Sequence, residues 1–146
     1  KLFEYLSILL ITNFTIKTYK IMVKAKYQDV LSLGEALNIQ NGNVTEENGV
    51  LKIKGTANTL YDKDVLWDKI KEIGGDNPSD IMANISVADD SVYARHTVKS
   101  GETLGKIAKH YYGKASKYQD IFKANSDILK NPDVIHPDQE LIIPKL

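Results

Sequence analysis

The chain has 146 residues, of which 42% are hydrophobic, enough for one medium domain or two small ones with a buried core. It contains no cysteine, which excludes disulfides, thiolate catalysis and cysteine-bound zinc. The formal net charge is zero, but residues 22–91 carry 7 basic against 12 acidic side chains, and residues 92–146 carry 9 against 6. This division suggests two units, and neither has the dense basic stripe that nucleic-acid binding requires.

The N-terminal 21 residues contain a short apolar stretch, residues 5–11, that is too short to span a bilayer. No small-residue cleavage site follows this stretch, as a secretory signal would need. We therefore interpret residues 1–21 as upstream sequence or a peripheral extension outside the native fold, with Met22 as a natural start and the cytoplasm as the location. A degenerate export signal, which would place the protein in the cell envelope or periplasm, is the alternative.

Residues 22–90 predict a small α+β domain that begins with a helix and a hairpin. Apolar residues at helical spacing indicate a helix over residues 23–37. The Asn-Gly pair at residues 48–49 precedes alternating apolar and charged residues at 51–54, which is typical of a β-hairpin. We expect Gly55 to close the second strand of this hairpin.

A second helix and a third strand are predicted to complete this domain. Thr59 and Asp62 have the spacing of a helix start, and the glycines at residues 74–75 stop the helix. Alternation over residues 81–87 predicts a strand, so the helices should cover one side of a small sheet. The polar segment at residues 89–93 is the expected boundary with the next domain.

The C-terminal third of the chain predicts a strand, two helices and a closing strand. Residues 103–112 have apolar side chains at helical spacing along one stripe. Ser116 and Gln119 have the spacing of a capping box at the start of the second helix. Residues 137–138, Pro-Asp, suit the centre of a type I turn, and the closing strand follows at residues 141–143.

Three segments of this region, "HTVKSGETLGKIAKHYYG", "YQDIFKAN" and "IHPDQELIIP", resemble the LysM domain family in the family's own order. The resemblance covers residues 93–145 and implies a βααβ domain, here residues 93–146, that binds peptidoglycan, chitin or another polymer of N-acetylglucosamine. Three positions depart from the family pattern. Glu102 replaces the commoner aspartate and would be a weaker helix N-cap, His136 replaces the aromatic residue before the closing proline, and Asp138 replaces the turn glycine.

The LysM resemblance implies a shallow ligand groove between two loops. The implied positions are Gly101, Glu102, Thr103 and Leu104 before the first helix, and Val134, Ile135, His136 and Pro137 before the last strand. A glycine would let a sugar approach the backbone, and apolar side chains would form a wall for the acetamide methyl group. The alternative interpretation is that Thr103 and Leu104 only begin a helix and Ile135 only fills the core.

Residues 24–88 resemble a BON domain in topology, through the hairpin segment "VLKIKG", the helix after it and the last strand. The combination resembles small bacterial proteins of the BON–LysM type that bind potassium. This resemblance implies potassium as an alternative ligand, held by carbonyl oxygens that leave no ionisable signature in a sequence. A protein-interaction adaptor is a third possibility.

The remaining titratable residues do not predict catalysis or a transition-metal site. The three histidines, residues 96, 110 and 136, lack the spacing of a metal site. Asp62 and Asp64 lack the glycine and terminal glutamate of a calcium loop, so we interpret them as acids in the first turn of a helix. The sequence therefore predicts a monomeric, non-enzymatic binding protein without a cofactor, potassium apart.

Overall fold

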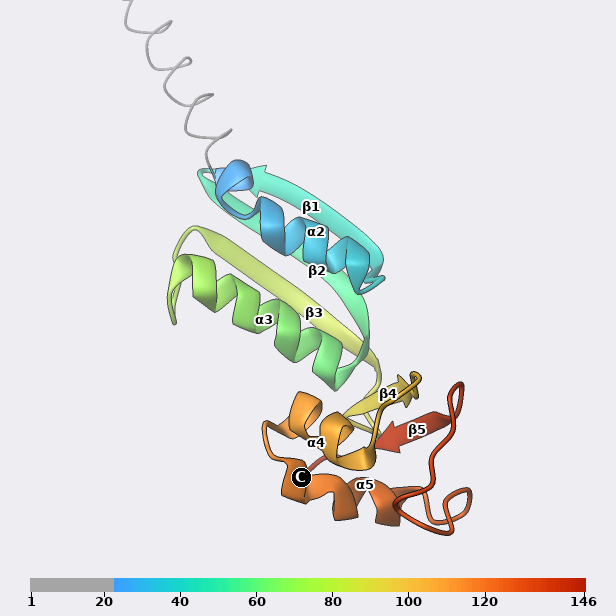
Figure 1. Ribbon diagram of the computed structural model, residues 1–146. Coiled ribbons are helices and arrows are strands. Elements are labelled where there is room, and N and C mark those ends of the chain that lie inside the picture. Colours follow the sequence, from blue (N-terminus) through green and yellow to red (C-terminus); the bar gives the residue numbers. More distant parts are fainter. Residues whose placement is uncertain (1–22) are drawn as a thin grey trace, which may run out of the picture. The chain divides into compact units, whose positions relative to one another are not determined.

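The computed structural model describes residues 23–146, which divide into two compact units (Figure 1). The first unit comprises residues 23–57 and 63–86, and the second comprises residues 58–62 and 87–146. The predicted N-terminal extension lies outside the described residues. None of the helices in the described range is both long and apolar enough to cross a membrane.

The first unit has the predicted order of helix, two strands, helix and strand. Its elements are α2 (Gln28–Ala36), β1 (Gln40–Glu47), β2 (Val50–Thr59), α3 (Leu60–Gly74) and β3 (Ile81–Asp89). The strands form one sheet in the order β1-β2-β3, and β1 and β2 are antiparallel. Figure 1 shows α2 and α3 lying on the same face of this sheet, as predicted.

The core of the first unit fills the space between this sheet face and the two helices. Tyr27 and Val30 come from the α2 side and Ile70 from α3, and each is at most 1% exposed. From β2, Leu51 and Ile53 point inward, whereas Lys54 is exposed. The alternation expected for this strand is therefore confirmed.

The prediction that Gly55 ends the second strand is wrong, because β2 continues to Thr59. A Cβ atom on Gly55 would lie 2.5 Å from Ile39 Cγ2 and 3.3 Å from the Gln40 carbonyl oxygen. The register of β1 shifts between Gln40 and Asn43, opposite this position. Gly55 therefore marks a close approach of two chain segments at an irregularity in the sheet, rather than the end of a strand.

Both predicted ends of α3 are confirmed. At its start, the Thr59 hydroxyl and backbone N–H donate to Asp62 Oδ2 at 2.9 and 3.1 Å. At its end, Gly75 has a φ of +84° and donates its N–H to the Lys71 carbonyl at 2.8 Å. Glycine is favoured there because it adopts left-handed backbone conformations without steric cost.

The second unit has the predicted strand, helix, helix, strand order. Its elements are β4 (Ala94–Thr97), α4 (Leu104–Tyr112), the 3₁₀ turn η1 (Ala115–Lys117), α5 (Tyr118–Ala124) and β5 (Glu140–Ile143). β4 and β5 pair antiparallel, and both helices contribute to a core of their own. The α+β class expected from the sequence is confirmed.

The predicted capping box of the second helix is wrong. Ser116 lies within η1, and α5 begins at Tyr118 without a side-chain cap. Instead, the Tyr118 N–H donates to the Ala115 carbonyl, and Lys117 N–H donates to the Lys114 carbonyl at 3.2 Å. Tight 3₁₀ bonds thus satisfy the backbone groups that a cap would otherwise satisfy.

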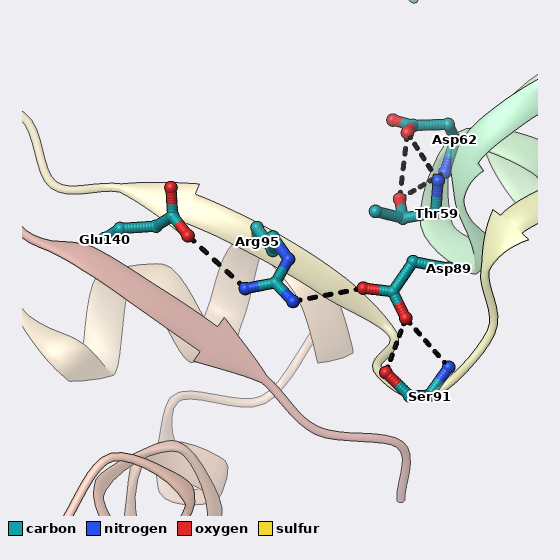
Figure 2. A network of polar contacts seen from close by, with 6 residues as sticks. All are labelled: Thr59, Asp62, Asp89, Ser91, Arg95 and Glu140. Atoms are coloured by element: carbon teal, nitrogen blue, oxygen red, sulfur yellow. Dashed lines mark hydrogen bonds and ion pairs between the residues drawn. The ribbon is translucent and has the colours of Figure 1, made fainter. Parts of the chain in front are cut away.

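The segment before β4 is fastened within the second unit by polar contacts (Figure 2). Asp89 accepts hydrogen bonds from the Ser91 hydroxyl and backbone N–H, and it pairs with Arg95 Nη2 at 3.1 Å. These contacts, led by those from Ser91, lower the pKa of the Asp89 carboxyl group. Arg95 also contacts Glu140 Oε1 at 3.3 Å, so one guanidinium links this segment to β5.

An aromatic cluster lies beside the core of the second unit and includes a residue from the short 58–62 segment. The Tyr61 ring lies 5.7 Å from Tyr93 and 4.7 Å from Tyr111, measured between centroids. The Tyr61 N–H also donates to the Tyr93 carbonyl at 2.9 Å. Edge contacts of this kind add to the stabilisation that burial of the rings provides.

Candidate functional site

The two loops implied by the LysM resemblance leave the β4–β5 sheet at the same end. Thr97, the last residue of β4, pairs with Glu140, the first residue of β5. Beyond this pair, Val98 N–H donates to the Gln139 carbonyl, and Asp138 N–H donates to the Val98 carbonyl, both at 2.9 Å. The antiparallel pairing therefore joins the bases of loop 99–103 and loop 134–139.

Gly101 presents an open backbone face in the first loop. It is exposed, has a φ of +79°, and a Cβ atom at this position would find nothing within 4 Å. Its carbonyl oxygen accepts a hydrogen bond from Lys106 Nζ at 2.8 Å. A ligand can approach this backbone closely, which agrees with the role expected for a glycine here.

The next residues of the loop begin α4, and here one prediction is corrected. Thr103, not Glu102, is the N-cap, because its Oγ1 accepts the Lys106 N–H at 3.2 Å. Leu104 is the first residue of α4, as the alternative interpretation expected, and it is only 2% exposed and belongs to the core. Glu102 is free of the capping role because its carboxylate points back to the start of the loop.

Glu102 is the centre of a polar network that sequence spacing did not reveal. One carboxylate oxygen, Oε2, accepts Lys99 N–H at 2.8 Å and lies 2.7 Å from His96 Nε2. The opposite nitrogen of His96 lies 3.1 Å from the Tyr111 hydroxyl. The pKa of the Glu102 carboxyl group is lowered, mainly by the hydrogen bond from the Lys99 N–H and secondly by the one from His96.

The second loop mixes exposed side chains with one that supports the core. Val134 is 49% exposed, and His136 and Pro137 are exposed as well. Ile135 is half-buried and packs against the core of the second unit. Of the eight implied positions, Gly101, Thr103, Val134, His136 and Pro137 are therefore accessible, whereas Leu104 and Ile135 support the loops from below.

The turn before β5 differs from the predicted type I turn. Its closing bond is present, from Gln139 N–H to the His136 carbonyl at 3.2 Å. Asp138, however, has a φ of +67°, whereas the third residue of a type I turn has a negative φ. A positive φ after proline is typical of a type II turn, which favours glycine at this position.

Replacing Asp138 with glycine is therefore expected to stabilise the second unit. An L-residue in the left-handed region costs about 1 kcal/mol relative to glycine. The hydrogen bonds within residues 136–139 involve the backbone and the Gln139 side chain, not the Asp138 side chain. Thermal unfolding of D138G should show a gain of about 1 kcal/mol in the free energy of unfolding. Asp138→Ala is the control, since alanine keeps the strain, and an equal gain there would contradict this explanation.

The three histidines have separate surroundings. His96 contacts Glu102 and Tyr111, and His110 Nε2 lies 3.1 Å from the Tyr61 hydroxyl. At His136 it is the backbone N–H that donates, to Gln139 Oε1 at 2.7 Å. Within residues 23–146, no three histidine or carboxylate side chains are grouped so that they could hold a metal ion.

Comparison with known proteins gives matches over short stretches of the chain. Over 50 residues the chain is 54% identical to the potassium binding protein Kbp of Escherichia coli O6:H1, a stretch covering 34% of either chain. Over 55 residues it is 49% identical to an uncharacterized protein of Deinococcus radiodurans, covering 38% of this chain and 20% of that one. The matched segments thus span about a third of Kbp and a fifth of the Deinococcus protein.

Comparison with protein families gives a match that covers most of the second unit. The LysM domain family matches residues 96–144, which include the end of β4, both helices of the second unit and β5. The resemblance of residues 24–88 to a BON domain stays a prediction. Residues 96–144 of this chain are a LysM domain.

Proposed function

We propose that the chain is a non-enzymatic binding protein whose LysM domain binds a polymer of N-acetylglucosamine between loops 99–103 and 134–139. The proposal rests on one observation: both loops leave the β4–β5 sheet of the LysM domain at the same end, next to each other. Peptidoglycan or a chitin-like glycan is then the ligand.

The chemistry of the accessible loop residues suits an acetylated sugar. The sugar would approach the backbone at Gly101, where no side chain intervenes. The acetamide methyl would contact Val134 and Pro137, which are apolar and exposed. Leu104 and Ile135 would act indirectly, by fixing the loops on the core. This combination of apolar contact and a few polar groups is typical of small-ligand sites.

Potassium is a second candidate ligand, favoured by a specific observation. The relative that is 54% identical over 50 residues is named a potassium binding protein. Potassium prefers a cage of neutral carbonyl oxygens, and a surrounding excess of negative charge raises the local cation concentration. The acidic excess lies in residues 22–91, outside the LysM domain, so this candidate function places the potassium site in the more acidic part of the chain.

A titration of the full chain followed by backbone amide chemical shifts separates these candidates. Chitohexaose, potassium chloride and sodium chloride are added to separate samples. Saturable shifts at residues 101–104 and 134–136 with the sugar alone are expected for glycan binding. A saturable response to potassium, with none to sodium or to the sugar, would favour the second candidate and contradict the first. No response to any of them would overturn both and leave a protein-interaction adaptor.

A matched pair of variants tests the glycan site itself. Val134 and Ile128 are equally exposed in the same unit, at 49% and 48%, but only Val134 lies in a proposed loop. Val134→Asp should weaken chitohexaose binding about tenfold, because it replaces apolar contact with a charge. Ile128→Asp should leave binding unchanged, and equal weakening in both variants would place the site elsewhere.

A further inference from the structure

Loop 99–103 is attached to the rest of its unit by a line of three titratable side chains. His96 lies in β4, Glu102 lies in the loop, and Tyr111 lies in α4. The Glu102 carboxylate is 2.7 Å from His96 Nε2, and the Tyr111 hydroxyl is 3.1 Å from His96 Nδ1. One imidazole ring therefore connects a strand, the loop and a helix.

The partners of His96 determine which ring nitrogen carries the proton in the neutral form. An ionised carboxylate only accepts hydrogen bonds, so Nε2 must donate to Glu102 and Nδ1 must accept from Tyr111. Burial raises the pKa of Tyr111 to about 12, so its hydroxyl keeps the proton that it donates. The His96 side chain is only 12% exposed, and its ring meets the Tyr111 ring edge-on at 5.6 Å.

We propose that His96 is a positioning residue that holds Glu102, and with it loop 99–103, in the conformation in which Gly101 and Thr103 face a ligand. The inference rests on the proposed function of these loops. Without the ring, Glu102 would keep only the Lys99 N–H, a contact inside the loop that cannot fix the loop to β4. If a loop samples several conformations, its apparent affinity for a ligand is reduced in proportion to the fraction of molecules in the binding-competent conformation.

The groups around His96 define how this attachment responds to pH. Glu102 contacts the ring from the loop, and Tyr111 contacts it from α4. Nearby Tyr61 and Asp62 add to the rise in the pKa of Tyr111. The residue paired with His96 on β5 is the uncharged Leu141. The pKa of Glu102 is lowered, so the attachment is complete above the ordinary glutamate range. It is lost as the pH falls through that lowered pKa, when the carboxylate is protonated.

The first test uses the full chain without ligand, because it does not depend on the glycan. In an acid titration followed by NMR, the Lys99 amide proton should shift upfield below the ordinary glutamate range as Glu102 is protonated. Glu102→Gln should abolish this transition, since the amide oxygen still accepts but does not titrate. Glu140→Gln, which removes an exposed carboxylate paired with Arg95, should leave it unchanged. In His96→Phe the transition should move up towards the ordinary glutamate range, because the hydrogen bond from His96 is one of the causes that lower the pKa of Glu102. The same transition in E102Q, or an unmoved transition in H96F, would overturn the inference.

The second test measures chitohexaose affinity at neutral pH. His96→Phe keeps a ring of similar size but removes both hydrogen-bonding atoms, and we expect binding to weaken on the order of tenfold. Tyr111→Phe keeps the ring packing and removes only the donor to Nδ1, so a smaller loss and a change in the His96 ¹⁵N shifts are expected. Glu140→Gln should bind as the wild type does.

The two tests separate failure of the inference from failure of the proposed function. Wild-type affinity in both H96F and Y111F would show that His96 does not position the loop. A wild type that does not bind chitohexaose, yet shows the expected Lys99 transition, would overturn the proposed glycan function and leave only the attachment of the loop.

Discussion

Replacing Asn125 with alanine is expected to lower the free energy of unfolding of the second unit by about 3 kcal/mol. The Asn125 side chain is 1% exposed and binds Ile142 as a neighbouring strand would. Its Oδ1 accepts the Ile142 N–H at 2.8 Å, and its Nδ2 donates to the Ile142 carbonyl at 2.8 Å. Alanine would leave both backbone groups of Ile142 without these partners, and each such loss costs about 1–3 kcal/mol when the group is buried.

Urea unfolding, followed by the amide signals of β5, measures this effect. Asn131→Ala is the control: Asn131 is exposed, and its side chain accepts only the Asp133 N–H in its own turn at 2.9 Å. We expect that variant to lose less than about 1 kcal/mol. Equal losses of unfolding free energy in the two variants would show that the contacts of Asn125 with Ile142 do not stabilise the unit.

The second large effect is expected in the first unit, where Gly55→Ala should cost about 2 kcal/mol. The new methyl group would lie 2.5 Å from Ile39 Cγ2 and 3.3 Å from the Gln40 carbonyl oxygen. The Ile39 side chain can rotate away, but the backbone oxygen can move only with β1. Overpacking of this kind typically costs 1–3 kcal/mol.

Gly42→Ala is the matched control in the same hairpin. Its Cβ atom would have the Ile39 carbonyl oxygen as its nearest neighbour, at 3.9 Å, which is ordinary contact. This variant should stay within about 0.5 kcal/mol of the wild type. Fluorescence of Trp67, the chain's one tryptophan, reports unfolding of this unit because Trp67 packs against its core. If G42A loses as much stability as G55A, the steric explanation is wrong.

The helices and strands could be predicted because their signals are local. Apolar spacing identified the stripe of α4, and alternation identified β3, since burial on one side leaves a period of 3.6 or 2 residues in the sequence. The ends of α3 were predicted for the same reason. Thr59 and Asp62 contact each other across only three positions.

The corrections at Gly55, Glu102 and Asp138 concern contacts that local spacing does not reveal, or a turn whose backbone conformation the residue type does not determine. Gly55 was interpreted as a strand end because the residue it approaches, Ile39, lies far from it in the sequence, just before β1. Glu102 was interpreted as a cap because its real partner, His96, is six residues earlier across a turn. Asp138 adopts a conformation that favours glycine, which its identity did not predict.

The eight positions of the candidate site stay a prediction. The LysM resemblance led to the eight loop positions, but the sequence could not say which of them are accessible. That distinction depends on packing, which buries Leu104 and leaves Val134 exposed. The contacts of Asn125 with Ile142 were equally hidden, although the residue was part of the resemblance, because a family pattern does not specify hydrogen-bond partners.

The second unit is discontinuous in the sequence, since it includes residues 58–62, which are the end of β2 and the start of α3. A fragment of residues 87–146 would lack the Tyr61 ring and the hydrogen bond from its N–H to the Tyr93 carbonyl. Transplanting the LysM domain into another protein, or isolating it for crystallisation, would thus leave Tyr93 and Tyr111 with an uncovered ring face. The excised domain should bind hydrophobic dyes and self-associate more than the intact chain does, unless those tyrosines are replaced by polar residues.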